Sequence, residues 1–144
     1  MSHSVFIDGE AGTTGLQIRD RLLGRDDIRL IQIDPARRKD AEARAEAFRA
    51  ADVAILCLPD DAAREAVELT RDMDVRLIDA STAHRIDPDW VFGYAELAPE
   101  MRELIAGARF VSNPGCYSTG SIAMIAPLVA AGLIEENEAL TINA

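Results

Sequence analysis

One cysteine lies in a sequence context suited to nucleophilic catalysis. Cys116 follows the turn Asn113-Pro114-Gly115 and precedes a largely apolar run that predicts a helix over residues 117–131. The amino end of a helix stabilises a thiolate relative to a thiol, and a turn leaves the sulfur accessible. Free amides of the same turn can also hold an oxyanion. We therefore interpret Cys116 as a nucleophile.

The second cysteine has different surroundings. Cys57 lies inside the apolar run 53–58, where a cysteine ordinarily acts as a small buried hydrophobe. Two cysteines in a chain of 144 residues do not make a disulfide framework. We expect the two thiols to have different roles.

Three glycines near the amino terminus are spaced as in a phosphate-binding turn. They form a G-x-x-G-x-x-G pattern directly after the apolar run 5–8 and before a helical apolar pattern. The commoner spacing is G-x-G-x-x-G, so the position after the first strand carries the assignment. Backbone amides and the helix amino terminus in such a turn face a pyrophosphate. We expect the cofactor to contact Gly9, Gly12, Thr13, Thr14 and Gly15.

The end of the second predicted strand, residues 28–33, bears on which dinucleotide binds. Asp34 lies roughly 20 residues after Gly15, where an acidic residue binds a ribose hydroxyl and favours NAD. Arg37, Arg38 and Lys39 follow at once, and a guanidinium can pair with a 2′-phosphate. We predict NADP(H), held by Arg37 and Arg38. The alternative is that these cations are only the solvated start of a helix over residues 36–51.

Polar residues gather again after the fourth predicted strand, residues 75–78. The run Ser81-Thr82-Ala83-His84-Arg85 lies at the same edge of the predicted sheet as the glycine loop. We expect Ser81 to contact the cofactor, and Arg85 and Asn113 to contact the substrate. The alternative is a loop ordered by local hydrogen bonds alone. We predict no metal site.

The spacing of these segments predicts the scaffold. Apolar strands alternate with helical patterns, which indicates an α/β, Rossmann-like, doubly wound and mostly parallel sheet. The run 53–58 is apolar throughout, as in a strand covered on both faces. Residues 139–144 predict a further strand with no cap or turn after it, so we expect the chain to stop partway through a larger protein. We divide it into residues 1–116, an NADP-binding domain, and residues 117–144, the nucleophile-bearing helix and the start of an α+β substrate and dimerisation domain that is largely absent.

Composition narrows the class of protein. The net charge is −10 and the isoelectric point is about 4.6, which disfavours a nucleic-acid partner. No apolar stretch reaches the ~18 residues of a membrane-spanning helix, and the amino terminus has no leader pattern. We expect a cytoplasmic protein that acts on a small molecule away from the membrane and forms a homo-oligomer at full length.

A dinucleotide site and a cysteine nucleophile together indicate one chemistry. A thioester can accept hydride from a reduced nicotinamide and then release an aldehyde. An acyl phosphate is a suitable donor, because phosphate leaves readily when cations hold it. The sequence alone leaves open a non-catalytic dinucleotide-binding module.

Three motifs resemble the shorter type of the N-acetyl-γ-glutamyl-phosphate reductase family of arginine biosynthesis. They are residues 9–15, 81–85 and especially 112–120, and the resemblance covers essentially the whole chain. The related aspartate-semialdehyde dehydrogenases carry Asn-Cys-Thr in place of Asn-Pro-Gly-Cys-Tyr. Ser118 departs from the proline usual in the family.

The resemblance implies a substrate and a mechanism. Cys116 would attack the γ-acyl phosphate of N-acetylglutamate, and NADPH would reduce the thioester to the semialdehyde with release of phosphate. In the family a histidine of the second domain is the acid/base, and neither His3 nor His84 matches its motif, so we expect this chain alone to be inactive. The alternatives within this chemistry are an aspartate-semialdehyde or an N-acetyl-aminoadipyl-phosphate reductase.

Overall fold

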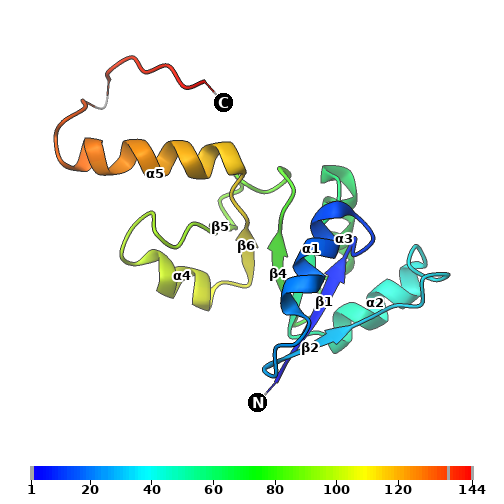
Figure 1. Cartoon of the computed structure of the whole chain (residues 1–144). Helices are drawn as coiled ribbons and strands as arrows, with labels where there is room; N and C mark the ends of the chain where they lie inside the picture. The colour runs from blue at the N-terminus through cyan, green and yellow to red at the C-terminus, as the bar shows by residue number, and fades with distance from the viewer. Residues whose placement is uncertain (1, 136, 144) are drawn as a thin grey trace.

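A parallel sheet of six strands forms the framework of the protein. In the computed structural model, which describes residues 2–135 and 137–143, strands and helices alternate along the chain (Figure 1). The strands lie in the order β2-β1-β3-β4-β6-β5 and every pairing is parallel, so the predicted α/β, doubly wound fold is confirmed. The strands are β1 (His3–Asp8), β2 (Ile28–Ile31), β3 (Val53–Leu56), β4 (Arg76–Asp79), β5 (Val91–Phe92) and β6 (Phe110–Ser112). The five helices of the described residues are α1 (Thr13–Leu22), α2 (Ala41–Ala50), α3 (Asp60–Leu69), α4 (Met101–Gly107) and α5 (Cys116–Ala130).

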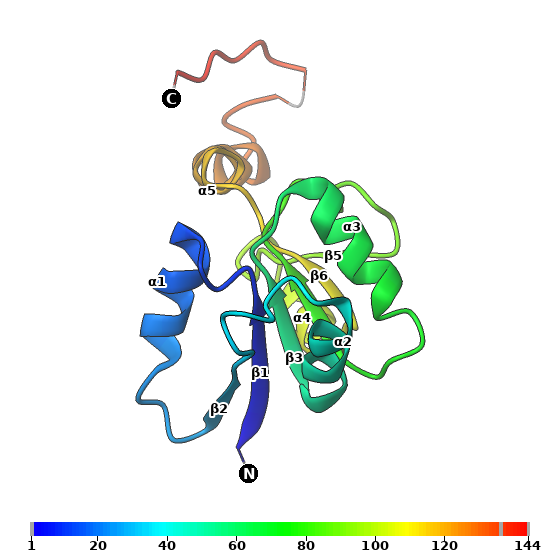
Figure 2. The ribbon, with the colours of Figure 1, turned by 90° about the vertical axis from the view of Figure 1, so that its right-hand side faces the viewer.

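The strand order reverses at β1. The chain leaves β1 for β2 on one side and then returns to β3 on the other. In Figure 2, α1 lies on one side of the sheet, and α2 and α3 lie on the opposite side. A reversal of this kind opens a crevice beyond the carboxyl ends of the strands, where ligands bind in open α/β sheets.

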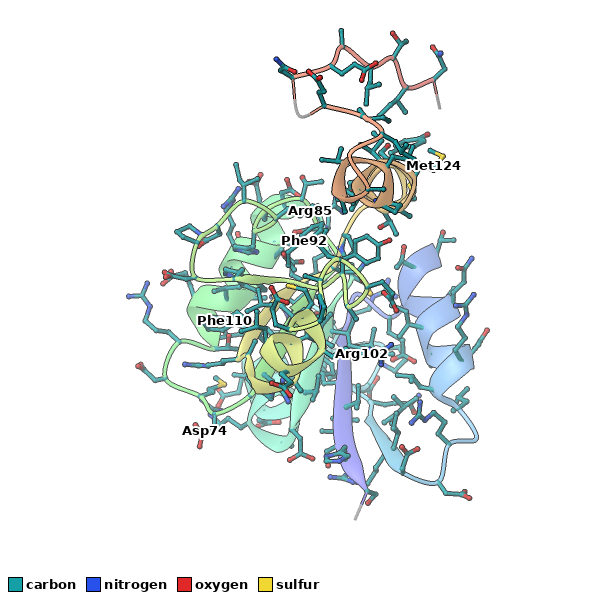
Figure 3. All side chains as sticks on the ribbon, turned by 90° about the vertical axis from the view of Figure 1, so that its left-hand side faces the viewer. Asp74, Arg85, Phe92, Arg102, Phe110 and Met124 are labelled. Carbon is teal, nitrogen blue, oxygen red and sulfur yellow. The ribbon has the colours of Figure 1, made fainter. Side chains whose placement is uncertain are left out.

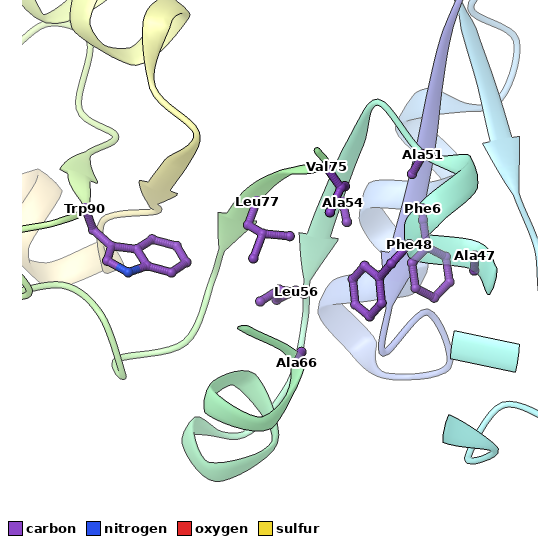
Figure 4. Close-up of a cluster of buried hydrophobic side chains, with 10 residues drawn as sticks. All are labelled: Phe6, Ala47, Phe48, Ala51, Ala54, Leu56, Ala66, Val75, Leu77 and Trp90. Carbon is purple, nitrogen blue, oxygen red and sulfur yellow. The ribbon is translucent and has the colours of Figure 1, made fainter. Parts of the chain in front are cut away.

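The main core lies between the sheet and the pair α2 and α3. Phe6 and Phe48 meet edge to face at 5.1 Å, and Leu56 and Leu77 are completely buried (Figure 4). The opposite face of β3 is only half-buried, because α1 lies over β1 and β2. The expectation that β3 is covered on both faces is therefore wrong for this chain.

The loop between β1 and α1 depends on two glycines. Gly9 has a φ of +90°, and a Cβ there would overlap the carbonyl oxygen of Cys57. A Cβ at Gly15 would overlap the carbonyl oxygen of Gly9 and lie 2.7 Å from the Cα of Glu10. The loop is thus packed backbone to backbone, which only glycine permits.

Helix α2 begins five residues later than predicted. Asp40 caps it, accepting hydrogen bonds from the amides of Glu42 (2.9 Å) and Ala43 (3.1 Å). Residues 35–39 form a turn, so the predicted helix over residues 36–51 is wrong in its first part, and the basic residues 37–39 do not start a helix. An aspartate that bonds the first free amides sets the start of a helix more strongly than intrinsic propensity does.

Two further differences concern strands. The two-residue strand β5 was not predicted, because it exists through its pairing of Val91 with Val111, which local sequence does not signal. Residues 139–143 form no strand, so the predicted final strand is wrong there, and Ala144 lies outside the described residues. A strand needs a neighbour for its backbone hydrogen bonds, and the described tail has none.

Helix α5 leads away from the sheet. Figures 1 and 2 show it beyond the carboxyl end of β6, and none of its residues is buried. It ends as predicted at Gly132, which has a φ of +66°, with the Leu133 amide bonded to the Leu128 carbonyl at 2.9 Å. Among the described residues, no helix is both long and apolar enough to cross a membrane.

The packing of the glycine loop is tested by substitution. Gly15→Ala should lower the free energy of unfolding by about 2 kcal/mol or more, because the added methyl group meets only backbone atoms. Gly107→Ala at the end of α4 is the matched control, since a Cβ there meets nothing within 4 Å. Urea unfolding of both variants measures the difference, and equal stabilities would contradict the close packing of this loop.

Candidate active site

A cavity of about 790 Å³ lies at the strand-order reversal. Its walls come from the carboxyl end of β1, the glycine loop, α1, the segment after β2 and the start of α3. Of the residues predicted to bind the cofactor, Gly9, Gly12 and Arg38 line it, together with Lys39. The structure thus brings the glycine loop and part of the basic turn to one cavity.

The other predicted cofactor residues do not line this cavity. Thr13 and Thr14 are exposed in the first turn of α1, and Gly15 is buried against the loop. Arg37 reaches Asp40, with the closest ion-pair distance at 3.3 Å. Ser81 is buried, and its hydroxyl donates to Asp79 at 2.7 Å.

The amino end of α1, next to the cavity, has the donors that a diphosphate needs. Gly12 is the N-cap of α1 without a side-chain cap, and the helix's first hydrogen bond runs from the Leu16 amide to the Gly12 carbonyl at 2.9 Å. Within residues 2–135, the amides of residues 13–15 therefore have no helical partner. Because a free helix amino terminus attracts anions, these residues fit a nicotinamide dinucleotide.

Four cationic side chains line the cavity, and they differ in whether a carboxylate already pairs with them. Arg44 lies 2.7 Å from Asp8, and both side chains are largely buried. Arg19 lies 3.4 Å from Glu10. Arg38 and Lys39 have no ion-pair partner in the part of the chain that the structure describes. These two are therefore the cations free to meet a phosphate group.

The buried pair of Asp8 and Arg44 was missed by the sequence analysis. Asp8 ends β1, and Arg44 lies in the first turn of α2, 36 residues later. An aspartate at the end of an apolar strand is a visible signal, but nothing local identifies which of many arginines reaches it. The pair links α2 to the end of β1 at the rim of the cavity. Removing either partner would leave the other charge buried without a counter-ion, which is strongly destabilising.

The turn before α5 presents the nucleophile candidate. Cys116 is the exposed first residue of α5, and the N-cap Gly115 makes no side-chain cap. The hydroxyls of Ser118 and Thr119 donate to the Gly115 carbonyl at 2.9 Å and 2.8 Å, and the Thr119 amide donates to it at 2.9 Å. The amides of residues 116–118 precede the first helical hydrogen bond, so they are available to an oxyanion.

The cysteine turn and the cavity share one edge of the sheet without merging. β3 and β4 lie between β1 and β6, so the two features are three strand spacings apart, about 14 Å. Cys116 is not among the residues that line the cavity. A dinucleotide bound in the cavity must therefore extend along the strand ends to reach the sulfur.

Arg85 lies beside the cysteine turn. Its Nε donates to the Asn113 carbonyl at 3.2 Å, and its Nη2 donates to the Ala80 carbonyl at 3.3 Å. Figure 3 shows Arg85 at the same end of the sheet as α5. Asn113 is exposed, and its backbone amide donates to the Asp79 carbonyl at 2.7 Å. Both residues predicted to bind substrate are thus placed together next to Cys116.

The second cysteine and the two histidines lie away from the cysteine turn or are buried. Cys57 follows the end of β3 instead of lying inside it, which corrects the prediction, and it is half-buried. Burial, followed by the negative charges of Asp8 and Asp79, raises the pKa of its thiol to about 11. His3 begins β1 at the opposite edge of the sheet, and His84 is buried against Asp79. Among the described residues, no three potential metal ligands converge.

Comparisons with known proteins match this arrangement. Residues 32–105 match the family model of the semialdehyde dehydrogenase NAD-binding domain. The chain is 58% identical over 140 residues to an N-acetyl-gamma-glutamyl-phosphate reductase of Trichormus variabilis, covering 97% of this chain and 44% of the relative. It is 56% identical over 145 residues to the reductase of the same name from Brucella ovis, covering 100% and 47%. The chain thus spans less than half the length of these curated relatives, and the predicted resemblance is confirmed.

Solved structures show the same fold at low identity. Aspartate semialdehyde dehydrogenase from Francisella tularensis superposes with a TM-score of 0.69 at 16% identity, covering 92% of this chain and 42% of that one. The enzyme from Candida albicans, solved with NADP, gives a TM-score of 0.67 at 15% identity, covering 91% and 48%.

The two thiols should differ sharply in reactivity. At pH 7.5 a thiol with a pKa of about 11 is ionised in roughly one molecule in a few thousand, so iodoacetamide should spare Cys57. Exposed Cys116 should be alkylated, and raising the pH toward 11 should increase labelling at Cys57. Peptide mass spectrometry follows both sites, with the urea-unfolded chain, where both should react, as control. Equal labelling of the two thiols in the native chain would contradict the assignment.

Proposed function

Because the chain belongs to the semialdehyde dehydrogenase family, whose NAD-binding domain it carries, we propose that it is the cofactor-binding and nucleophile-bearing part of an NADPH-dependent N-acetyl-γ-glutamyl-phosphate reductase. One observation carries the proposal. Exposed Cys116 begins an uncapped helix at the same sheet edge as a cavity that is lined by unpaired cations and adjoins the free amides of α1.

Cys116 performs the first chemical step of the proposed mechanism. Its sulfur attacks the carbonyl carbon of the acyl phosphate, the carbon–oxygen bond to phosphate breaks, and a thioester remains on Cys116. The amides of residues 116–118 stabilise the negative oxygen that forms during the attack. Arg85, held against the turn, meets the departing phosphate.

The cavity would hold the reductant, because a nicotinamide cofactor can supply hydride to a thioester carbon when it is bound. Cys116 would then leave as a thiolate as the carbon–sulfur bond breaks and the aldehyde is released. The free amides of α1 would hold the diphosphate of this cofactor, and Arg38 and Lys39 would meet the 2′-phosphate that distinguishes NADPH.

The proton donor and acceptor lies outside these 144 residues in this proposal. His3 is at the far edge of the sheet, and His84 is buried on Asp79, so neither faces Cys116. The curated relatives are more than twice as long as the matched region. We further propose that residues 117–144 begin the second, substrate-binding domain and that the full-length protein acts as a homo-oligomer.

The role of Cys116 is tested in the full-length protein. Cys116→Ala should lower aldehyde formation from the acyl phosphate, and the reverse, phosphate-dependent oxidation of the aldehyde, by at least about a thousandfold, because no other group supplies the thioester. Cys57→Ala is the matched control variant and should retain activity. Aspartyl phosphate is the control substrate, since an aspartate-semialdehyde reductase is the alternative within this chemistry. Undiminished turnover by Cys116→Ala would refute the mechanism.

The cofactor preference is tested with this chain alone. Arg38→Gln should weaken NADPH binding about tenfold or more while changing NADH binding by less than about twofold, because a charge-assisted hydrogen bond to the 2′-phosphate is lost. Arg37→Gln is the matched control, since Arg37 lies outside the cavity and pairs with Asp40. Isothermal titration calorimetry measures all four affinities. Equal losses for both cofactors, or equal losses in both variants, would refute the preference.

A further inference from the structure

A completely buried carboxylate organises the loop after β4. Asp79 accepts hydrogen bonds from the Ser81 amide (2.9 Å) and the Ser81 hydroxyl (2.7 Å), and its Oδ2 lies 2.7 Å from Nδ1 of His84. We call Asp79, Ser81 and His84 the Asp79 network. It closes residues 79–84 into a tight turn.

The imidazole of His84 is held on its face as well as at its edge. It stacks on Trp90 with ring centroids 4.3 Å apart and planes at 11°, and Trp90 stacks on Phe110 at 5.0 Å. Phe110 begins β6, the strand that leads directly into the cysteine turn. The histidine is therefore braced against the element that carries the nucleophile.

A second contact fixes the outer side of the same loop. Both the amide and the hydroxyl of Thr82 donate to the carboxylate of Asp60 at the start of α3. These hydrogen bonds lower the pKa of Asp60, so the carboxylate stays ionised and keeps both partners at neutral pH. Ser81, Thr82 and His84 thus each use their side chain to hold the loop.

Arg85 is the next residue, and its guanidinium reaches the opposite loop. Besides its bonds to Asn113 and Ala80, it packs on Gly115, where a Cβ would lie 2.7 Å from Nη1. Within the described residues, Nη1 donates to no protein acceptor. A cation is thus held on the backbone of the cysteine turn with donor capacity to spare.

We propose that Asp79 and His84, braced by Trp90, are positioning residues that hold the Arg85 guanidinium against the Cys116 turn, where it receives an anionic group of the substrate. Neither His84 nor Asp79 touches the reacting atoms, because both are buried beneath the loop. The inference rests on the proposed function, in which Cys116 is the nucleophile.

The charge beside Cys116 can be measured without turnover. The rate of Cys116 alkylation by anionic iodoacetate is divided by its rate with neutral iodoacetamide, which cancels changes in the reactivity of the sulfur itself. Arg85→Gln should lower this ratio about threefold or more, and 0.5 M salt should lower the wild-type ratio toward the same value. Peptide mass spectrometry follows Cys116 in the 144-residue chain.

Variants of His84 then test the positioning. His84→Ala should lower the ratio as Arg85→Gln does, while the iodoacetamide rate stays within about twofold. His84→Asn, whose amide can donate to Asp79, should restore most of the ratio. His3→Ala, at the far end of β1, should leave it unchanged. If His84→Ala does not fold by circular dichroism, the comparison of His84→Asn and Trp90→Phe with wild type decides.

The outcomes separate the two proposals. A folded His84→Ala with the wild-type ratio would overturn the positioning role alone, as would an Arg85→Gln ratio equal to wild type. Cys116 unreactive toward both reagents would instead overturn the proposed function and this inference with it.

Discussion

The site depends most on the hydrogen bonds of Asp79, which is completely buried at the end of β4. Its carbonyl oxygen accepts the Asn113 amide at 2.7 Å, which ties the cysteine turn to β4. Its carboxylate binds Ser81 and His84 on the other side. A buried carboxylate is costly unless its hydrogen bonds are satisfied, so the loop has one strongly favoured conformation. One residue therefore sets the geometry of both loops at this end of the sheet.

Burial and nearby charge distinguish the two cysteines. Burial, followed by the negative charges of Asp8 and Asp79, raises the pKa of the Cys57 thiol to about 11 and so keeps it protonated at neutral pH. Cys116 lies beyond the carboxyl end of β6, where it is exposed at the amino terminus of α5. Two identical side chains at one edge of a sheet thus have different environments, in keeping with the proposal that Cys116 alone is the nucleophile.

What the sequence could predict was local. The glycine loop, the cysteine turn and the cap at Gly132 each depend on neighbours within a few residues, and the structure places a tight turn or a helix end at each. The predicted start of α2 was wrong because the Asp40 side chain caps the helix at Ala41 and so overrides the helix propensity of the residues before it.

The contacts between distant residues were beyond reach of the sequence. The pairing of Asp8 with Arg44 and the stack of His84 on Trp90 join separate segments, and strand β5 exists only beside β6. Side-chain types and spacing identified which residues could do chemistry. They did not identify which arginine stays free, because pairing is decided by the packed fold.

The apolar surface of α5 bears on how the two parts of the chain relate. Tyr117, Met124 and the following Leu133 are 69%, 61% and 73% exposed, although the helix is composed mainly of apolar residues. The half-buried face of β3 is also apolar, with Val53 and Ile55 only partly covered. Large exposed apolar patches ordinarily mark surfaces that lie against other protein. This exposure supports the proposal that residues 117–144 begin a second domain, because such a domain would cover the exposed apolar sides of α5.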